Sequence, residues 1–423
     1  MSALPRHLLP QTAAVDGGRL SIGGCDAIEL AERFGTPAFV YDEVHLRERC
    51  REAVEAFGEG ATYGSKAFLC TAMARLAHEE GMRIDVATGG ELHVVLAAGV
   101  PADRIVLHGN NKSEAELGMA MAAGVGRIVV DSEEEIGRIE RLVPSEGFEP
   151  PKVLVRVTPG VEAHTHEYVM TGQDDTKFGF GLASGAAAAA VERIGRSPAL
   201  DLVGVHAHIG SNIFLLSGYE KAVERLAPFV VPLDLPELCL GGGLGVAYVA
   251  GEESVPIAEW AGLLRRSCAE AGITSQLVVE PGRAIVAAAA VTLYRVGTIK
   301  VLPGIRTYVA VDGGMSDNPR PVLYGSGYEA FLPRAVDADR ELVATVVGKH
   351  CESGDLIVRD ATLPADVAVG DVLATPVTGA YGHSMASNYN KVLRPPVVFV
   401  RDGEARVVVR RETLDDLLWL DVD

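Results

Sequence analysis

The sequence contains few cysteines, and none of them are closely paired. Six cysteines are spread over 423 residues without a Cys-x-x-Cys motif. This spacing speaks against a disulfide framework and against cysteine zinc sites, which need several sulfur ligands close together in the chain. Scattered cysteines are typical of proteins in a reducing compartment, so we expect a cytoplasmic protein with reduced thiols.

The sequence also lacks positive charge. It has 38 lysines and arginines against 57 aspartates and glutamates, for a formal net charge of -19. Such a surplus of negative charge repels nucleic acid and anionic membrane surfaces, so neither is an expected partner.

No apolar run is long enough to cross a bilayer. The longest lies between Arg283 and Arg295 and is shorter than the roughly 20 residues that a spanning helix needs. The start, "MSALPRHLLPQTAAVDGG", lacks the apolar stretch and the small-residue cleavage site of a signal peptide. We therefore expect no membrane association.

What the sequence does contain is a regular alternation of two patterns. From about residue 60 to residue 285, short β-branched runs alternate with stretches of helical period. About eight strand–helix units are present, the number needed to close a parallel (β/α)8 barrel. A doubly wound sheet is the structural alternative, but "GGGLG" at Gly241 lacks the GxGxxG spacing of dinucleotide-binding sheets. The runs begin at Ala61, Arg83, Arg104, Arg127, Lys152, Asp201, Glu237 and Ser275.

The pattern changes after about residue 286. Short strands such as "TYVAVDGG" and "ELVATVVG" are separated by Gly, Asp and Pro turns, and little helical period remains. This pattern predicts an antiparallel β-domain, a sandwich or a barrel. We expect an α/β protein in two parts: a barrel over residues 37–285, and a β-domain from residues 1–36 and 286–423.

Residues able to do chemistry follow the apolar runs. The carboxyl ends of barrel strands all lie on one face, where active sites are built, so these residues are expected to meet there. In chain order they are Lys66, Asp85, His108, Asp131, Arg156, His208 to Ser211, Gly241 to Gly243, and Glu280 to Arg283.

Three of these features together suggest pyridoxal phosphate as a cofactor. Lys66 lies in the apolar stretch "YGSKAF", and an unprotonated lysine amine forms Schiff bases with carbonyls; the alternative is a surface lysine. Glycines at 210, 241–243 and 282, with Ser211 and Arg283, are suited to hold a phosphate. Glu280 in "EPGR" would face the pyridine nitrogen and keep it protonated.

Two groups of histidines need separate interpretation. His206 and His208 alternate along one expected strand and so face the same side. No third ligand at suitable spacing is evident, so an aromatic face against a flat cofactor is favoured over a metal site. "HTHEY", with His164, His166 and Glu167, is expected in a polar loop that could act as a lid, with metal binding the less favoured alternative.

The motifs resemble those of diaminopimelate decarboxylases, which have the alanine-racemase-like fold of pyridoxal phosphate enzymes (fold type III). The resemblance extends from about Asp26 to the C-terminus, and the motifs occur in the same order. They are "YGSKAF", "DVATGGEL", "LHGNNKS", "RVTPGVEAHTHEY", "TKFGFG", "GVHAHIGSN", "LGGGLG", "EPGRAI", "VDGGMSDNPRPVLYG", "HCESGD" and "TGAYGHSMASNYN".

The resemblance implies a set of cofactor-binding residues. Lys66 would hold pyridoxal 5'-phosphate covalently, and His208 would stack on its ring. The full expected set is Lys66, Asp85, Arg156, His208, Ser211, Gly243, Glu280, Gly282, Arg283 and Tyr381, of which Lys66, His208 and Glu280 are also expected to be catalytic.

The resemblance also implies how the substrate is held. Arg283, Arg320 and Tyr324 would bind the carboxylate at its non-reacting end, and Tyr381 would touch both cofactor and substrate. The stretch "KHCESGD" contains Cys351 and Glu352, which would enter the active site of a partner subunit in a homodimer. A thiol can return a proton near neutral pH, and a carboxylate can pair with an ammonium group. The plain alternative for Cys351 is a small apolar residue at a strand end.

The expected reaction is decarboxylation of meso-2,6-diaminopimelate at its D-centre to L-lysine and carbon dioxide. Two alternatives stay open: a related α-decarboxylase of ornithine, lysine, arginine or a carboxy-polyamine, and a catalytically silent regulatory homologue. The sequence departs from the family pattern at Thr88, Thr158 and Thr378, where serine, asparagine and aspartate are usual. None of these changes removes a group that performs chemistry.

Overall fold

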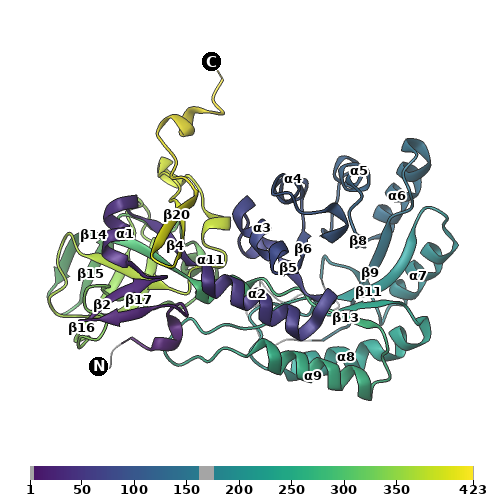
Figure 1. Ribbon diagram of the computed structural model, residues 1–423, viewed down its shortest axis with the longest axis horizontal. Coiled ribbons are helices and arrows are strands. Elements are labelled where there is room, and N and C mark those ends of the chain that lie inside the picture. Colours follow the sequence, from purple (N-terminus) through teal and green to yellow (C-terminus); the bar gives the residue numbers. More distant parts are fainter. Residues whose placement is uncertain (1–3, 162–175, 423) are drawn as a thin grey trace. The chain divides into compact units, whose positions relative to one another are not determined.

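The computed structural model describes residues 4–161 and 176–422 of the chain (Figure 1). The chain forms two compact units. Unit 1 comprises Met1–Arg49, Val246–Glu253 and Ile285–Asp423, and unit 2 comprises Cys50–Gly245 and Ser254–Ala284. In the described residues, no helix combines the length and apolar character needed to cross a membrane.

Unit 2 is the expected parallel barrel. Each of the eight apolar runs forms a strand, and neighbouring strands pair in parallel in chain order. The first and last strands meet through a short parallel bridge between Ala61 and Val279. The strands are β5 (Thr62–Gly64), β6 (Arg83–Val86), β7 (Ile105–Leu107), β8 (Arg127–Val130), β9 (Lys152–Thr158), β11 (Asp201–Ala207), β12 (Glu237–Cys239) and β13 (Gln276–Val278); the short β10 (Phe180–Gly181) pairs with β9.

Helices surround these strands, as Figure 1 shows for α3 to α6. Each helix turns an apolar face to the strands, as α6 does with Ile136, Ile139 and Val143, which are spaced by three and four residues. The helices are α3 (Thr71–Glu79), α4 (Gly89–Ala97), α5 (Glu114–Ala123), α6 (Glu133–Glu146), α7 (Ala186–Arg196), α8 (Ser217–Val230), α9 (Ile257–Glu270) and, spanning the unit boundary, α10 (Arg283–Val286).

The barrel interior is packed with side chains. Five strands each contribute one buried residue to a single cluster: Val106, Val129, Leu154, Cys239 and Val278. Strands of a parallel barrel are buried on both faces, which explains their nearly continuous apolar sequence. The barrel is therefore filled, and chemistry is confined to the strand ends.

Unit 1 contains a mixed β-sheet, and the expectation of a purely antiparallel domain is wrong. The strand order is β17-β16-β15-β14-β4-β19-β20, with β18 also paired to β14. The pairs β15–β16 and β19–β4 are parallel. Parallel pairs join strands that are distant in the chain, so the local turn pattern does not reveal them. The strands are β4 (Ala38–Asp42), β14 (Ala290–Leu302), β15 (Arg306–Val311), β16 (Leu342–Val347), β17 (Leu356–Leu363), β18 (Val372–Pro376), β19 (Val397–Arg401) and β20 (Glu404–Val409).

Strand β4 belongs to unit 1, so the barrel begins later in the chain than the sequence predicts. The expected barrel started at residue 37, but β4 pairs with β14 and β19 in unit 1. The long helix α2 (Glu43–Phe57) then leads into unit 2. Unit 1 contains in addition α1 (Ala27–Phe34), α11 (Arg320–Tyr324) and a small sheet of β1 (Ala14–Asp16), β2 (Arg19–Ile22) and β3 (Cys25–Asp26).

A buried ion pair ties α6 to the barrel strands. Lys112 Nζ lies 2.8 Å from Glu135 Oε1, and both side chains are 1% exposed. The same ammonium donates to the carbonyls of Gly109 and Val129, each at 2.7 Å. Burial raises the pKa of Glu135 to about 7, although Lys112 opposes this shift. The pair therefore depends on both partners being present.

We expect Lys112→Met to destabilise the protein by about 3–5 kcal/mol, because it leaves the Glu135 carboxylate buried without its cation. The double variant Lys112→Met/Glu135→Leu removes both charges and should be more stable than the single variant. Urea unfolding followed by circular dichroism measures both. A double variant no more stable than Lys112→Met would contradict the role given to the pair.

Candidate active site

Lys66 lies directly after the first barrel strand. It is in the short 3-10 turn Ser65–Ala67, and its side chain is exposed. The backbone N–H of Ser65 donates to Asp85 Oδ1 at 3.1 Å, so the carboxylate at the end of β6 anchors the turn that presents the lysine. Lys66 thus follows the strand as expected, although in solvent contact rather than in an apolar setting.

Glu280, which follows the eighth strand, lies between two imidazoles. His206 Nε2 is 3.1 Å from one carboxylate oxygen, and His108 Nε2 is 2.9 Å from the other. His206 comes from β11 and His108 directly follows β7. The three side chains are 2–11% exposed. Three separate strand ends therefore build one buried polar cluster.

The cluster keeps Glu280 ionised. Burial acts to raise the pKa of Glu280, but His108 and His206 outweigh it and hold this pKa well below its usual range. Burial likewise acts to lower the pKa of His108, yet Glu280 outweighs it and raises that pKa. Burial lowers the pKa of His206 to about 4. At neutral pH an ionised Glu280 accepts a hydrogen bond from Nε2 of a neutral His206, and the raised pKa of His108 favours its charged form.

His208 lies two residues beyond His206 and faces a different environment. Its Nδ1 accepts a hydrogen bond from the backbone N–H of Gly242 at 3.2 Å. Burial lowers the pKa of His208 well below its usual value, and the nearby charges of Arg156 and Lys66 add to this. The result is a neutral, oriented imidazole close to Lys66.

Arg156 and Ser211 bring further polar groups to the same strand ends. Arg156 lies opposite His206 in the β9–β11 register, and its Nη1 is 3.7 Å from Asp131 Oδ2. Ser211 Oγ accepts a hydrogen bond from Arg283 Nη2 at 2.9 Å. Ser211 and Arg283 therefore meet although 72 residues separate them in the chain.

Glycines let the strand ends of unit 2 pack closely. A Cβ on Gly243, whose φ is +97°, would lie 2.2 Å from the carbonyl oxygen of Gly210. A Cβ on Gly282 would lie 2.5 Å from the carbonyl oxygen of Gly64. Side chains at these positions would push the loops apart, so glycine is required by close backbone approach.

The expected substrate residues of unit 1 lie on two segments. Arg320 and Tyr324 are four residues apart on α11 and so share a face. Tyr381 has a φ of +59°, a left-handed conformation that is costly for a bulky residue. Its hydroxyl is among the groups that raise the pKa of Arg320 against the effect of burial. Arg320 and Tyr381 are therefore neighbours within unit 1.

The "KHCESGD" segment is a braced loop. Asp355 Oδ2 accepts a hydrogen bond from the backbone N–H of His350 at 2.8 Å, and Asn390 Oδ1 accepts one from the N–H of Cys351 at 3.2 Å. Cys351 and Glu352 are both exposed at its tip. The loop thus presents a thiol and a carboxylate to its surroundings.

Sequence reasoning missed part of the site. The sequence places His108 at a strand end but gives no sign of its pairing with Glu280. The sequence indicates no third metal ligand beside His206 and His208, whereas in the structure ligand atoms of His108, His206 and Glu280 lie within 4.8 Å of one another. The Nε2 atom of each of the two imidazoles faces a carboxylate oxygen of Glu280, so the cluster is accounted for as an ion-paired group. The histidines of the expected loop, His164 and His166, lie with Glu167 outside the described residues.

The three threonines that depart from the family pattern form local hydrogen bonds. Thr88 caps α4, since its side chain accepts from the N–H of Glu91. Thr158 Oγ donates to the carbonyl of Phe178 at 2.8 Å, and Thr378 shares a 2.8 Å hydrogen bond with Thr292.

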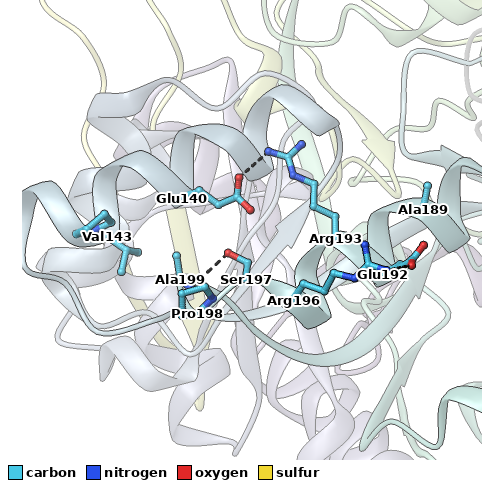
Figure 2. Close-up of a pocket in the computed structure, with 10 residues that line it drawn as sticks. Glu140, Val143, Ala189, Glu192, Arg193, Arg196, Ser197, Pro198 and Ala199 are labelled. Atoms are coloured by element: carbon cyan, nitrogen blue, oxygen red, sulfur yellow. Dashed lines mark hydrogen bonds and ion pairs between the residues drawn. The ribbon is translucent and has the colours of Figure 1, made fainter.

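The groove drawn in Figure 2 lies elsewhere on unit 2. It is lined by the C-terminal parts of α6 and α7 and by the segment that leads into β11. Barrel helices run antiparallel to the strands, so this groove is near the amino ends of the strands. Arg193 and Glu140, which face each other in Figure 2, are 2.6 Å apart. The groove is therefore separate from the strand ends that carry Lys66 and Glu280.

The residues at the barrel mouth fit pyridoxal phosphate. An exposed lysine amine suits its aldehyde, an ionised carboxylate suits its ring nitrogen, and a neutral imidazole offers a flat face to its ring. Ser211, Arg283 and the glycine-rich loops supply donors for a phosphate. Residues 43–287 match the family described as "Pyridoxal-dependent decarboxylase, pyridoxal binding domain". Fold and site thus define a pyridoxal-dependent decarboxylase.

Comparison with individual proteins identifies the family within this class of decarboxylases. The chain is 48% identical to the diaminopimelate decarboxylase of Mycobacterium tuberculosis, over 98% of this chain and 99% of that one. It is 45% identical to that of Bacillus subtilis, over 96% and 95%. The crystal structure of the M. jannaschii diaminopimelate decarboxylase with L-lysine has a TM-score of 0.91 and 33% identity, covering 98% of each chain. The chain belongs to the diaminopimelate decarboxylase family.

The charge distribution around Glu280 can be tested by a histidine titration. In cofactor-free protein with 15N-labelled histidines, the His206 ring should stay neutral down to about pH 5, and the His108 ring should remain protonated above pH 6.5. The variants His206→Gln and His108→Gln assign the signals. Because an unfolded histidine takes up a proton near pH 6.5 and folded His206 does so at about pH 4, His206 lowers the free energy of unfolding as the pH falls through that window. Midpoints near 6.5 for both rings would contradict the proposed arrangement.

Proposed function

We propose that this chain decarboxylates meso-2,6-diaminopimelate at its D-centre, with pyridoxal 5'-phosphate as cofactor, and releases L-lysine and carbon dioxide. The observation that carries the chemistry is the buried Glu280 carboxylate, which two histidines keep ionised. The choice of substrate is supported by relatives at 44–48% identity that are named diaminopimelate decarboxylases.

Residues of unit 2 would hold the cofactor. Lys66 would provide the amine for covalent attachment, and His208 would lie against the ring. Glu280 would face the ring nitrogen and favour its protonated form, because the pKa of this carboxylate is held well below its usual range. Ser211, Gly243, Gly282 and Arg283 hold the phosphate, and Asp85 and Arg156 support the surrounding polar groups. When bound, pyridoxal phosphate supplies an electron sink for the electron pair left by the departing carbon dioxide.

Residues of unit 1 would recognise and protonate the substrate. Arg320, Tyr324 and Tyr381 would bind the carboxylate at the non-reacting end, and Arg283 of unit 2, besides holding the phosphate, is proposed to contribute to the same recognition. Glu352 pairs with the ammonium group at that end. Cys351 donates its thiol proton to the carbon from which carbon dioxide has left. Ornithine and lysine lack the distal carboxylate, so they would leave buried donors unpaired.

Cys351 and Glu352 are proposed to act in the partner's site of a cytoplasmic homodimer. Their exposure at the tip of a braced loop supports this, since a group that acts on a neighbouring subunit must be presented outward. The β-domain would then contribute both to the dimer interface and to the active site.

The function is tested by detecting lysine and carbon dioxide from meso-diaminopimelate, with ornithine and lysine as competing substrates. We expect turnover of diaminopimelate with a preference of at least roughly 10⁴ over the substrates that lack the distal carboxylate. Equal or greater turnover of ornithine would contradict the substrate assignment.

We expect Lys66→Ala to abolish turnover and the visible absorbance of the protein-bound cofactor, because the covalent link is lost. Circular dichroism should show an unchanged fold, since Lys66 is exposed. In the wild type, borohydride treatment should fix the cofactor to the peptide that contains Lys66. Exposed Lys177 provides the matched control, and Lys177→Ala should retain absorbance and turnover.

Subunit mixing tests the shared site. Inactive Lys66→Ala protein mixed with inactive Glu352→Ala protein should regain activity, because one site of each mixed dimer receives intact Lys66 and intact Glu352. Random exchange should restore roughly a quarter of wild-type sites, as follows from two-fold symmetry. If native mass spectrometry shows mixed dimers and the mixture stays inactive, Glu352 acts within its own chain.

A further inference from the structure

Arg320 is a buried arginine that has no acidic partner among the described residues. The residue is 5% exposed. In the described residues, no carboxylate oxygen lies within 4.0 Å of its guanidinium nitrogens. Two other buried arginines are paired with acids: Arg340 lies 3.0 Å from Glu329, and Arg156 lies 3.7 Å from Asp131. A buried cation is costly unless something else stabilises it.

Two tyrosines take the place of an acid. The guanidinium carbon of Arg320 lies 4.4 Å from the ring centre of Tyr248 and 5.6 Å from that of Tyr328. Arg320 Nη1 also donates to the Tyr328 hydroxyl at 2.7 Å. The two rings contact each other edge to face, with centres 5.2 Å apart and planes at 78°. Both tyrosines are at most 5% exposed.

The backbone around the tyrosines is held in place. The N–H of Tyr248 donates to Glu252 Oε2 at 2.8 Å. The N–H of Ala250 donates to Glu329 Oε1 at 3.2 Å, which joins the segment of Tyr248 to that of Tyr328. The other carboxylate oxygen of Glu329 is occupied by Arg340. Both rings are thus fixed before any ligand arrives.

Aromatic faces stabilise a cation without using its hydrogen-bond donors. A guanidinium has five N–H groups, and a carboxylate binds two of them along one edge. An acidic residue beside Arg320 would neutralise its charge and occupy that edge, whereas a ring face does neither. Burial acts to lower the pKa of Arg320, but the tyrosine neighbours outweigh this effect and raise it, so the guanidinium stays charged.

We propose that Tyr248 and Tyr328 are positioning residues that hold the Arg320 guanidinium buried, charged and open to the distal carboxylate of the substrate. This inference rests on the proposed function, because it concerns how that substrate is selected. It assigns to the two tyrosines a part in specificity and none in the bond-breaking step.

The test compares two inhibitors of the holoenzyme. L-Lysine, bound as the product, carries its one carboxylate at the distal end, and cadaverine is the same molecule without that carboxylate. In Tyr248→Leu, the inhibition constant of L-lysine and the KM of diaminopimelate should rise roughly tenfold, through loss of the cation–π contact. The inhibition constant of cadaverine, kcat and the cofactor absorbance should stay within about twofold, since none of them depends on Arg320.

Two conservative variants separate the ring from the hydroxyl. Tyr248→Phe keeps the ring face and should behave like the wild type. Tyr328→Phe removes only the hydroxyl that binds Arg320. It should raise the inhibition constant of L-lysine roughly three- to tenfold and leave the inhibition constant of cadaverine unchanged. If Tyr248→Leu fails to fold, the measurements on Tyr328→Phe still test the proposal.

The outcomes distinguish this inference from the function on which it rests. If the wild type releases no carbon dioxide from diaminopimelate, the proposed function is wrong. The tyrosine inference alone is overturned by either of two results with an active wild type. In the first, the variants bind L-lysine as tightly as the wild type. In the second, their affinities for L-lysine and cadaverine fall equally.

Discussion

The barrel is organised around a carboxylate that must remain charged while buried. Removing such an ion from water costs several kcal/mol unless partners offset the loss. Glu280 obtains its partners from β7 and β11, strands that are not its neighbours in the sheet. Only a barrel whose strand ends converge can bring them together. The cluster therefore depends on barrel closure and register, and its proposed role, keeping a cofactor ring nitrogen protonated, depends on them too.

Close approach of the strand ends imposes a second requirement, met by glycine. The turn after β5 and the loop after β13 come so near that a Cβ on Gly282 would lie 2.5 Å from a carbonyl oxygen. A Cβ on Gly242 would lie 2.2 Å from the carbonyl oxygen of Glu280 itself. The glycine-rich motifs are thus needed first for packing at the barrel mouth. Their suitability for a phosphate follows from the exposed backbone that this packing leaves.

The barrel could be predicted from the sequence because burial on both faces makes each parallel strand a distinct apolar run. The same topology predicted which residues meet, since strand ends share one face. Contacts across the barrel could not be predicted. His108 and Glu280 are 172 positions apart, and nothing local to either indicates the other. Strand direction in unit 1 could not be predicted for a similar reason, because β4 and β19 are nearly continuous buried apolar runs that read the same whichever way they pair.

The two units treat charge in opposite ways. Unit 2 buries an anion and surrounds it with histidines, so that its charge is nearly balanced before any ligand binds. Unit 1 buries a cation, Arg320, against aromatic rings and leaves its charge uncompensated by acids among the described residues. A balanced charge is suited to setting the protonation of a cofactor, because the charge of the cluster stays constant when a ligand binds. An unbalanced charge selects a ligand, because any molecule that lacks the complementary group leaves the buried donors unpaired. Specificity for a substrate with a second amino-acid head is therefore expected to reside in unit 1, where the uncompensated cation lies.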